Sequence, residues 1–143
     1  MSDDRDLQLR TPDRPLPKPD DVTSTYWDGC ARGELLIQHC PKCGHRQFYP
    51  RAMCTVCAST PEWERASGRG TVHTFTVIRQ NHAKPFRDLL PYVVAMIELD
   101  EGPRMMGNLV GCPVEDVAVG MPVEVFFDAA DDDLSLPFWR PAS

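Results

Sequence analysis

The sequence predicts a mainly β protein in which a short helix and a metal-binding module precede a small five-stranded barrel. Two Cys-x2-Cys pairs lie close together in the run CPKCGHRQFYPRAMCTVC at 40–57. After residue 67, short segments rich in Val, Ile and Thr follow one another at regular spacing, with no long helix between them. Five strands of this size are typical of a closed or partly closed barrel, although periodicity alone also allows a sandwich.

The composition fits one compact unit, or a small module joined to a slightly larger one. The chain has 143 residues, of which 42% are hydrophobic and 25% charged. No run approaches the roughly 18 apolar residues of a membrane helix, and the charged N-terminus lacks an apolar signal core. We therefore expect no membrane association and a cytoplasmic location. In a reducing compartment, the six cysteines favour metal ligation over disulfides.

The charge argues against a nucleic-acid partner. The formal net charge is −6, with 15 Lys and Arg spread along the chain against 21 Asp and Glu. Four thiolates around one Zn²⁺ would bring it to about −8. Proteins that bind single or double strands usually present a basic stripe. An OB-type barrel that binds nucleic acid is therefore kept only as an alternative.

The N-terminal third predicts an arm, a helix and short strands, in that order. Prolines among charged residues predict an extended arm over residues 1–22. A short helix is expected over 23–32, since Thr23 or Ser24 can cap it and Gly33 can end it. Its Tyr26-Trp27 pair needs a surface to cover, in this chain or in another. Strands are then expected at 34–39 and 47–49, and residues 62–66 lead out of the metal module.

The remainder predicts the barrel. Residues 71–79 alternate, residues 92–99 are nearly all apolar, and Asp100-Glu101-Gly102-Pro103 forms a tight turn into a strand at 104–110. A further strand is expected at 122–128, after a short helical or extended connection at 114–119, and the tail at 134–141 is expected to add an edge segment. We accordingly divide the chain into 1–22 (arm), 23–66 (helix and metal module) and 67–143 (barrel and tail).

The metal module has a closed set of ligands. Cys40, Cys43, Cys54 and Cys57 form two pairs with the spacing of metal-binding turns, and Gly44 supplies a left-handed residue after the first pair. Four thiolates leave no open position for water, so the site is expected to be structural rather than catalytic. Zn²⁺ is the expected ion, with a rubredoxin-like iron centre and hence a redox carrier as the alternative. His45 is adjacent but is not needed as a ligand.

The sequence contains no recognisable catalytic set. Cys30 and Cys112 are left as single cysteines without a nearby activating group, and both are assigned to structure. His73 and His82 are not accompanied by a recognisable acid or nucleophile, and the acidic run at 131–133 is assigned to a solvated turn. The chain alone is therefore not expected to be catalytic.

One loop stands out in an otherwise acidic chain. It groups four basic side chains around one aromatic ring and is the candidate site for CoA or for a partner, since cationic and aromatic groups together suit a nucleotide phosphate and its base. The residues are Arg79, His82, Lys84, Phe86 and Arg87. The alternative is a solvated loop in which Phe86 caps the barrel.

With this layout, the sequence closely resembles the DUF35 family, whose members join a rubredoxin-like zinc ribbon to an OB-fold. The resemblance covers about residues 23–141 and includes all four cysteines, which some family members lose. It rests on sequence motifs that follow one another in the same order as in the family. They are Tyr26-Trp27-Asp28-Gly29, Gly33-Glu34-Leu35-Leu36, the cysteine run, Gly68-Arg69-Gly70-Thr71-Val72, TFTV, PYVVAMIELDEGPRMMGNLVG, VGMPVEVFF and PFWRP.

The resemblance implies a non-catalytic accessory subunit in a hetero-oligomer with a thiolase-superfamily enzyme: a thiolase, an acyltransferase or a steroid side-chain aldolase. The larger subunit would carry the catalytic cysteine and histidines, and the small one would support the assembly and help to hold or pass on an acyl-CoA thioester. It would also place Tyr26, Trp27 and Phe126 at a partner interface. The family gives no residue-level CoA site, so the loop remains a prediction from this sequence.

Overall fold

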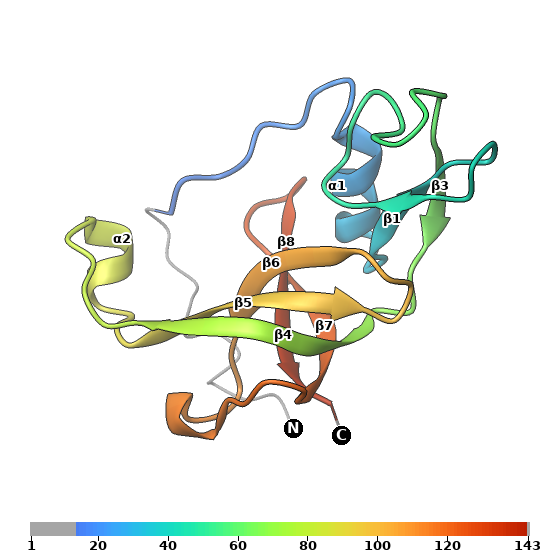
Figure 1. Cartoon of the computed structure of the whole chain (residues 1–143). Coiled ribbons are helices and arrows are strands. Elements are labelled where there is room, and N and C mark those ends of the chain that lie inside the picture. Colours follow the sequence, from blue (N-terminus) through green and yellow to red (C-terminus); the bar gives the residue numbers. More distant parts are fainter. Residues whose placement is uncertain (1–13, 143) are drawn as a thin grey trace.

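The structure is a computed structural model and describes residues 14–142. A helix, a three-stranded sheet and a five-stranded closed barrel follow one another along the chain (Figure 1). The elements are α1 (Ser24–Ala31), β1 (Leu36–His39), β2 (Arg46–Gln47), β3 (Glu62–Arg65), β4 (Arg69–Ile78), α2 (Lys84–Arg87), β5 (Tyr92–Leu99), β6 (Arg104–Leu109), a 3-10 helix at Val114–Asp116, β7 (Pro122–Ala129) and β8 (Ser135–Pro141). The predicted fold class is confirmed, while the division at 22/23 and 66/67 stays a prediction.

The two ends of α1 are fixed differently from each other. Before the helix, Asp20 Oδ1 accepts the N–H groups of Val22 and Thr23, both at 2.9 Å. The Thr23 hydroxyl bonds Asp20 in return, so the cap predicted from Thr23 is not made. At the other end, Gly33 has φ +80 and its N–H donates to Cys30 O, as the predicted stop requires.

The small sheet carries the cysteine loops and has the order β2-β1-β3. β1 lies in the middle and is antiparallel to both neighbours, with Gln38 opposite Gln47 on one side and Trp63 on the other. The return strand is two residues long and begins one residue earlier than the predicted 47–49. This sheet with its two cysteine loops is called the ribbon below.

The barrel has the strand order β4-β5-β6-β8-β7 and closes where β4 pairs β7. The tail predicted as an edge segment is instead the fifth barrel strand, which pairs β7 along its whole length and meets β6 at Leu109 and Trp139. The N–H of Ala142 donates to Pro122 O, so the even-numbered residues of β8 form the backbone hydrogen bonds to β7. The register is therefore compatible with prolines at odd-numbered positions of this strand. Pro137 and Pro141 therefore need no N–H on that side.

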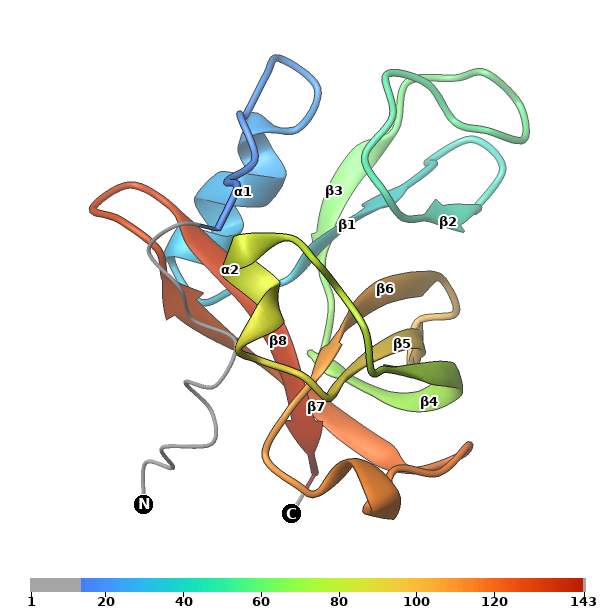
Figure 2. The same ribbon diagram turned by 90° about the vertical axis from the view of Figure 1, so that its left-hand side faces the viewer.

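One apolar core joins the helix, the ribbon and the barrel. Tyr26 is only 2% exposed and packs edge to face against Trp27, Phe48 and Tyr49, while Trp139 is fully buried in the same cluster. Figure 2 shows α1 alongside β8, with the ribbon on the other side of the helix. The helix therefore connects the ribbon to the barrel.

The partner interface predicted from three aromatic residues is wrong for Tyr26 and Trp27 and stays a prediction for Phe126. Tyr26 and Trp27 are covered by this chain, with Trp27 9% exposed. Phe126 is half-buried, stacks on Phe138 at 5.9 Å and lies under the Arg140 guanidinium at 5.0 Å. The short helix finds its surface within its own chain because β8 and the 48–49 loop pack against it.

The arm is described only from residue 14; the part of the prediction that concerns residues 1–13 lies outside the described residues. Over 14–20 the chain forms neither helix nor strand. The Arg14 guanidinium lies 5.4 Å from the ring centroids of both Phe86 and Phe138. Within residues 14–142, no helix is long and apolar enough to cross a membrane.

Candidate functional site

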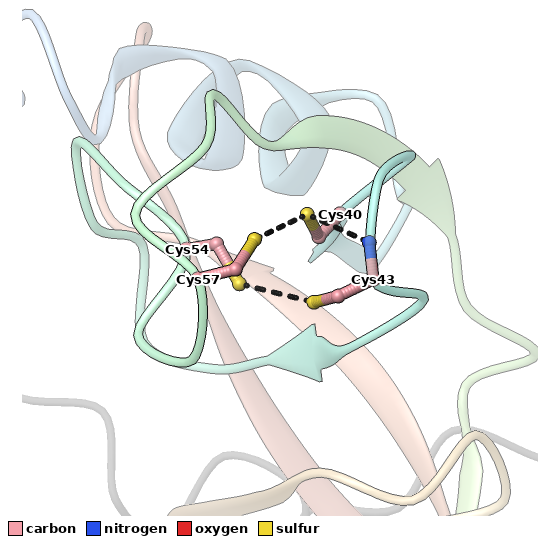
Figure 3. A group of neighbouring side chains, drawn as sticks. All are labelled: Cys40, Cys43, Cys54 and Cys57. Carbon is pink, nitrogen blue, oxygen red and sulfur yellow. Dashed lines mark hydrogen bonds between the residues drawn. The ribbon is translucent and has the colours of Figure 1, made fainter.

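The four cysteines of the ribbon point their sulfur atoms at one another. All four Sγ atoms lie within 4.8 Å of one another, with Cys40 and Cys57 at 3.5 Å and Cys43 and Cys54 at 3.6 Å (Figure 3). A tetrahedral Zn²⁺ with Zn–S bonds of about 2.3 Å separates its sulfurs by about 3.8 Å. The geometry and the donor set therefore fit a single Zn²⁺ ion.

The two cysteine loops repeat one backbone design. In the first, Cys40 N–H donates to His45 O at 2.8 Å and Gly44 N–H to Cys40 O at 2.9 Å; in the second, Cys54 N–H donates to Ser59 O and Ala58 N–H to Cys54 O at the same distances. The residue after each second cysteine has a positive φ, +81 at Gly44 and +63 at Ala58. The left-handed residue predicted at Gly44 is present, and its counterpart is an alanine.

Hydrogen-bond donors near the sulfurs favour the thiolate forms of Cys54 and Cys57. Cys43 N–H points at Cys40 Sγ at 3.5 Å, and Val56 N–H at Cys54 Sγ at 3.4 Å. The Ser59 hydroxyl, together with its N–H, lowers the pKa of the Cys57 thiol, and the N–H groups of Cys57 and Val56 lower the pKa of Cys54. Thiolates are the form that binds metal, so these donors prepare the site for a cation.

Two buried glutamines hold the segment between the cysteine pairs, and the sequence analysis did not identify them. Gln38 and Gln47 are 4% and 6% exposed. Gln38 exchanges two hydrogen bonds with the backbone of Arg51, at 2.8 and 2.9 Å, and accepts a third from Gln47 Nε2 at 2.8 Å. Gln47 Oε1 accepts the N–H of Thr55 at 2.9 Å. The sequence does carry a signal for them: Gln38 and Gln47 are polar residues in the two short strands that flank the first cysteine pair.

The arrangement suits a structural ion better than a catalytic one. The ligand group found among residues 14–142 consists of four cysteines, which complete a tetrahedron without water. His45 lies outside this group and contacts Thr55, with its Nε2 3.2 Å from the hydroxyl oxygen. That contact joins the two cysteine loops.

The predicted basic loop lies at the far end of the β4–β5 hairpin, where α2 forms a single turn (Figure 1). The side chains of Arg79, His82, Lys84 and Arg87 are exposed. Phe86 is half-buried, 6.2 Å from the Tyr92 ring and under Arg14. The structure therefore places these four basic side chains on one projection, while their ligand stays a prediction.

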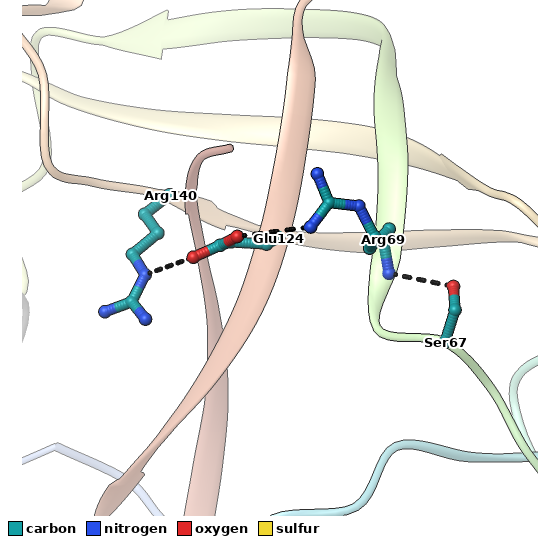
Figure 4. Close-up of polar contacts among 4 residues, drawn as sticks. All are labelled: Ser67, Arg69, Glu124 and Arg140. Carbon is teal, nitrogen blue, oxygen red and sulfur yellow. Dashed lines mark hydrogen bonds and ion pairs between the residues drawn. The ribbon is translucent and has the colours of Figure 1, made fainter. Parts of the chain in front are cut away.

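Other charged and nucleophilic groups are engaged in the fold. Glu124 on β7 accepts from Arg140 at 3.1 Å and from Arg69 at 3.5 Å, across the seam that closes the barrel (Figure 4). Cys30 is buried beside Tyr26, and burial raises the pKa of its thiol to about 11. Cys112 is half-buried and lies outside the sulfur cluster.

The chain matches two family models that together cover its ribbon and most of its barrel. Residues 27–64 match the model described as "ChsH2, rubredoxin-like zinc ribbon domain". Residues 63–128 match the one described as "ChsH2, C-terminal OB-fold domain". The two matches overlap at residues 63–64, within β3, the last strand of the ribbon.

Three relatives place these matches in context. A DUF35 domain-containing scaffold protein of Methanocaldococcus jannaschii is 41% identical over 103 residues, which are 69% of this chain and 71% of that protein. A probable enoyl-CoA hydratase alpha subunit of Thermomonospora curvata is 33% identical over 90% of this chain, and the chain spans only 40% of its length. A solved chain of the Ltp2-ChsH2(DUF35) aldolase superposes with a TM-score of 0.80 and 32% identity, over 90% of this chain and 100% of the other.

Proposed function

The chain belongs to the DUF35 family of zinc-ribbon and OB-fold proteins, and on that premise we propose that it is a zinc-stabilised, non-catalytic accessory subunit of a thiolase-like acyl-CoA enzyme. The observation that carries the proposal is the superposition on a whole chain of the Ltp2-ChsH2(DUF35) aldolase. That chain is named as one component of an aldolase assembly. The names of the scaffold and alpha-subunit relatives also describe parts of larger proteins or complexes.

In this proposal, Cys40, Cys43, Cys54 and Cys57 hold one Zn²⁺ that maintains the ribbon. When bound, the ion cross-links the two cysteine loops and adds its binding free energy to folding. The protein's own contribution is the set of N–H donors at the sulfurs and the two buried glutamines that bond the backbone of Arg51 and Thr55. The larger partner, a thiolase-superfamily subunit, carries out the chemistry on the acyl thioester.

Acyl-CoA is the proposed ligand of the complex, and the basic loop is its proposed contact. Four exposed basic side chains on one projection can meet the phosphates of CoA, and Phe86 offers a ring face near them. Replacing Lys84 and Arg87 together by alanine should raise the KM for the acyl-CoA by about tenfold, the loss of one to two charge-assisted contacts. An unchanged KM in the purified complex would assign the loop to scaffold.

The experiment that tests the accessory role is affinity purification of the tagged chain from its own host at low salt, followed by mass spectrometry. A thiolase-superfamily protein recovered in comparable amount, and acyl-CoA turnover that needs both proteins, are the expected results. Turnover of acyl-CoA by the isolated chain would overturn the proposal. So would recovery of the folded, zinc-loaded chain without a partner.

A further inference from the structure

The basic loop buries little of its own surface. Its helix, α2, is a single turn without a buried residue. Inside the loop, the N–H groups of Phe86 and Arg87 both donate to Ala83 O at 3.0 Å. Toward the barrel, Asn81 Nδ2 donates to the Tyr92 hydroxyl at 2.9 Å, and the Phe86 ring lies 6.2 Å from the Tyr92 ring. A segment with so little buried surface keeps one orientation only through specific contacts.

The arm supplies such a contact. Both views of the molecule show the described arm running from α1 to α2 (Figures 1 and 2). At its described end, the guanidinium carbon of Arg14 lies 5.4 Å from the centroid of the Phe86 ring and 5.4 Å from that of Phe138 on β8. Arg14 Nη2 also donates to Asn108 Oδ1 on β6 at 3.5 Å. One cation therefore connects the loop to two strands of the barrel, and these contacts are called the Arg14 bridge below.

The chemistry of an arginine suits this position. A guanidinium is flat, so its face can lie on a ring while its N–H groups donate in its own plane. Arg14 is half-buried, and burial lowers the pKa of its guanidinium, although arginine keeps its charge in proteins. Phe138 is 3% exposed and stacks on Phe126. The barrel end of the bridge is therefore held by packing, whereas its Phe86 end lies on the projection.

The arm itself has limited freedom between α1 and the loop. Pro15 and Pro17 lie in the wall of a pocket of about 370 Å³, together with Trp27 of α1. Prolines fix their φ angles, and segments rich in them behave as semi-rigid spacers. At the end next to α1, Asp20 O accepts the N–H of Ser24 at 2.8 Å. The arm therefore keeps its described end within a narrow range of positions relative to α1.

We propose that the Arg14 bridge fixes the orientation of the basic loop on the barrel, so that the arm sets where Lys84 and Arg87 lie. The inference rests on the proposed function in one respect, because that loop is the proposed contact for acyl-CoA. Arg14 is then a positioning residue for this contact. It acts through the loop and not on the thioester itself.

Amide hydrogen exchange on the chain alone tests the bridge without any ligand. In Arg14→Ala the amides of Phe86 and Arg87 should exchange about tenfold faster, because the loop loses its connection to β6 and β8. Trypsin cleavage after Arg87 should become faster for the same reason, while the amides of β5 keep their rates. Lys18→Ala is the matched control, since it removes an equal charge from an exposed position of the same arm. It should leave both measurements unchanged.

Kinetics of the complex test the positioning role. The probe is acyl-CoA with the thiolase-superfamily protein that co-purifies with the tagged chain. Arg14→Ala should raise the KM for acyl-CoA about fivefold and leave kcat unchanged, because a displaced loop weakens binding and not chemistry. In a chain that already carries Lys84→Ala and Arg87→Ala, adding Arg14→Ala should raise the KM no further. Arg14→Lys keeps the charge without the flat guanidinium and should recover little of the loss.

The outcomes separate the inference from the proposed function. Faster exchange in the loop of Arg14→Ala, but not of Lys18→Ala, supports the bridge. Unchanged loop exchange in an Arg14→Ala chain that keeps its zinc and its near-UV circular dichroism overturns the inference and leaves the accessory function standing.

The kinetic variants decide the positioning role in the same way. Full recovery of the KM by Arg14→Lys would overturn it, because charge alone would then explain the effect. A further rise in KM on adding Arg14→Ala to the Lys84 and Arg87 variant would also overturn it, because Arg14 would then contact the thioester directly. Faster loop exchange together with an unchanged KM in the Lys84 and Arg87 variant would support the bridge and remove the acyl-CoA contact from the proposed function.

Discussion

The ribbon and the barrel lie side by side in one chain, but their interiors differ in kind. The ribbon is built from strands of four, two and four residues, and it holds a partly exposed cluster of four thiols and two buried glutamines. The barrel strands are six to ten residues long, and its centre is apolar, with Ile97, Val123 and Trp139 essentially inaccessible to solvent. Beyond the apolar core that the two parts share, the ribbon relies on directed polar interactions and the barrel on area removed from water.

This difference predicts different sensitivities. Apolar contacts are many and non-directional, so a barrel loses stability in proportion to the volume removed. A cluster of thiols and amides is satisfied only when each partner is present, so the loss of one partner leaves the others unpaired. The ribbon should therefore fail abruptly and the barrel gradually.

The largest expected effect comes from Cys54→Ser. Structural Zn²⁺ contributes about 10–16 kcal/mol of apparent binding free energy in small ribbons, more than a three-stranded sheet can replace. The variant should lose zinc and partner binding, and amides of 36–65 should lose protection, while barrel amides keep theirs. Metal analysis and hydrogen exchange check this. Cys112→Ser, outside the sulfur cluster, is the control and should keep its zinc; unchanged zinc in Cys54→Ser would contradict the ligand assignment.

The corresponding test of the barrel is Ile97→Ala, which should lower stability without loss of zinc. Ile97 is fully buried, and large-to-small changes at such positions cost about 2–5 kcal/mol. Denaturant unfolding should show this loss, while the folded variant binds zinc as before. Ile97→Val should cost about 0.5–1.5 kcal/mol. If Ile97→Ala released zinc from the folded state, the two interiors would not be independent.

The sequence predicted the barrel and the ligands better than it predicted how the ribbon is held. The nearly unbroken apolar run at 92–99 matches β5, whose burial alternates along the strand. The tail at 134–141 was assigned to an edge segment, because the side on which its prolines lack an N–H follows only from the register with β7. Gln38 carries no periodic signal, since its partner is the Arg51 backbone thirteen residues away.

The role of that glutamine can be tested by Gln38→Leu. The substitution leaves the N–H and C=O of Arg51 without their partner inside the ribbon, at a cost of about 1–3 kcal/mol for each group that stays buried. Zinc affinity, measured by competition with a chelator, should fall while barrel stability is unchanged. Gln80→Leu, at an exposed position, should change neither beyond about 0.5 kcal/mol. Equal zinc affinity in the two variants would refute the role assigned to Gln38.

The smallest expected effect distinguishes the two cysteine loops from each other. Gly44 and Ala58 hold equivalent positions with φ +81 and +63, and a Cβ added at Gly44 would meet no atom within 4 Å. Gly44→Ala therefore tests the backbone alone and should cost about 1 kcal/mol, the usual penalty of a left-handed residue with a Cβ. Ala58→Gly relieves that penalty but gives the unfolded chain more freedom, so its gain should stay below about 1 kcal/mol. Thermal melting and zinc competition on both variants measure these opposite signs. If Ala58→Gly destabilised the ribbon as much as Gly44→Ala, backbone strain would not be what separates the two loops, and the alanine methyl itself would have to contribute packing.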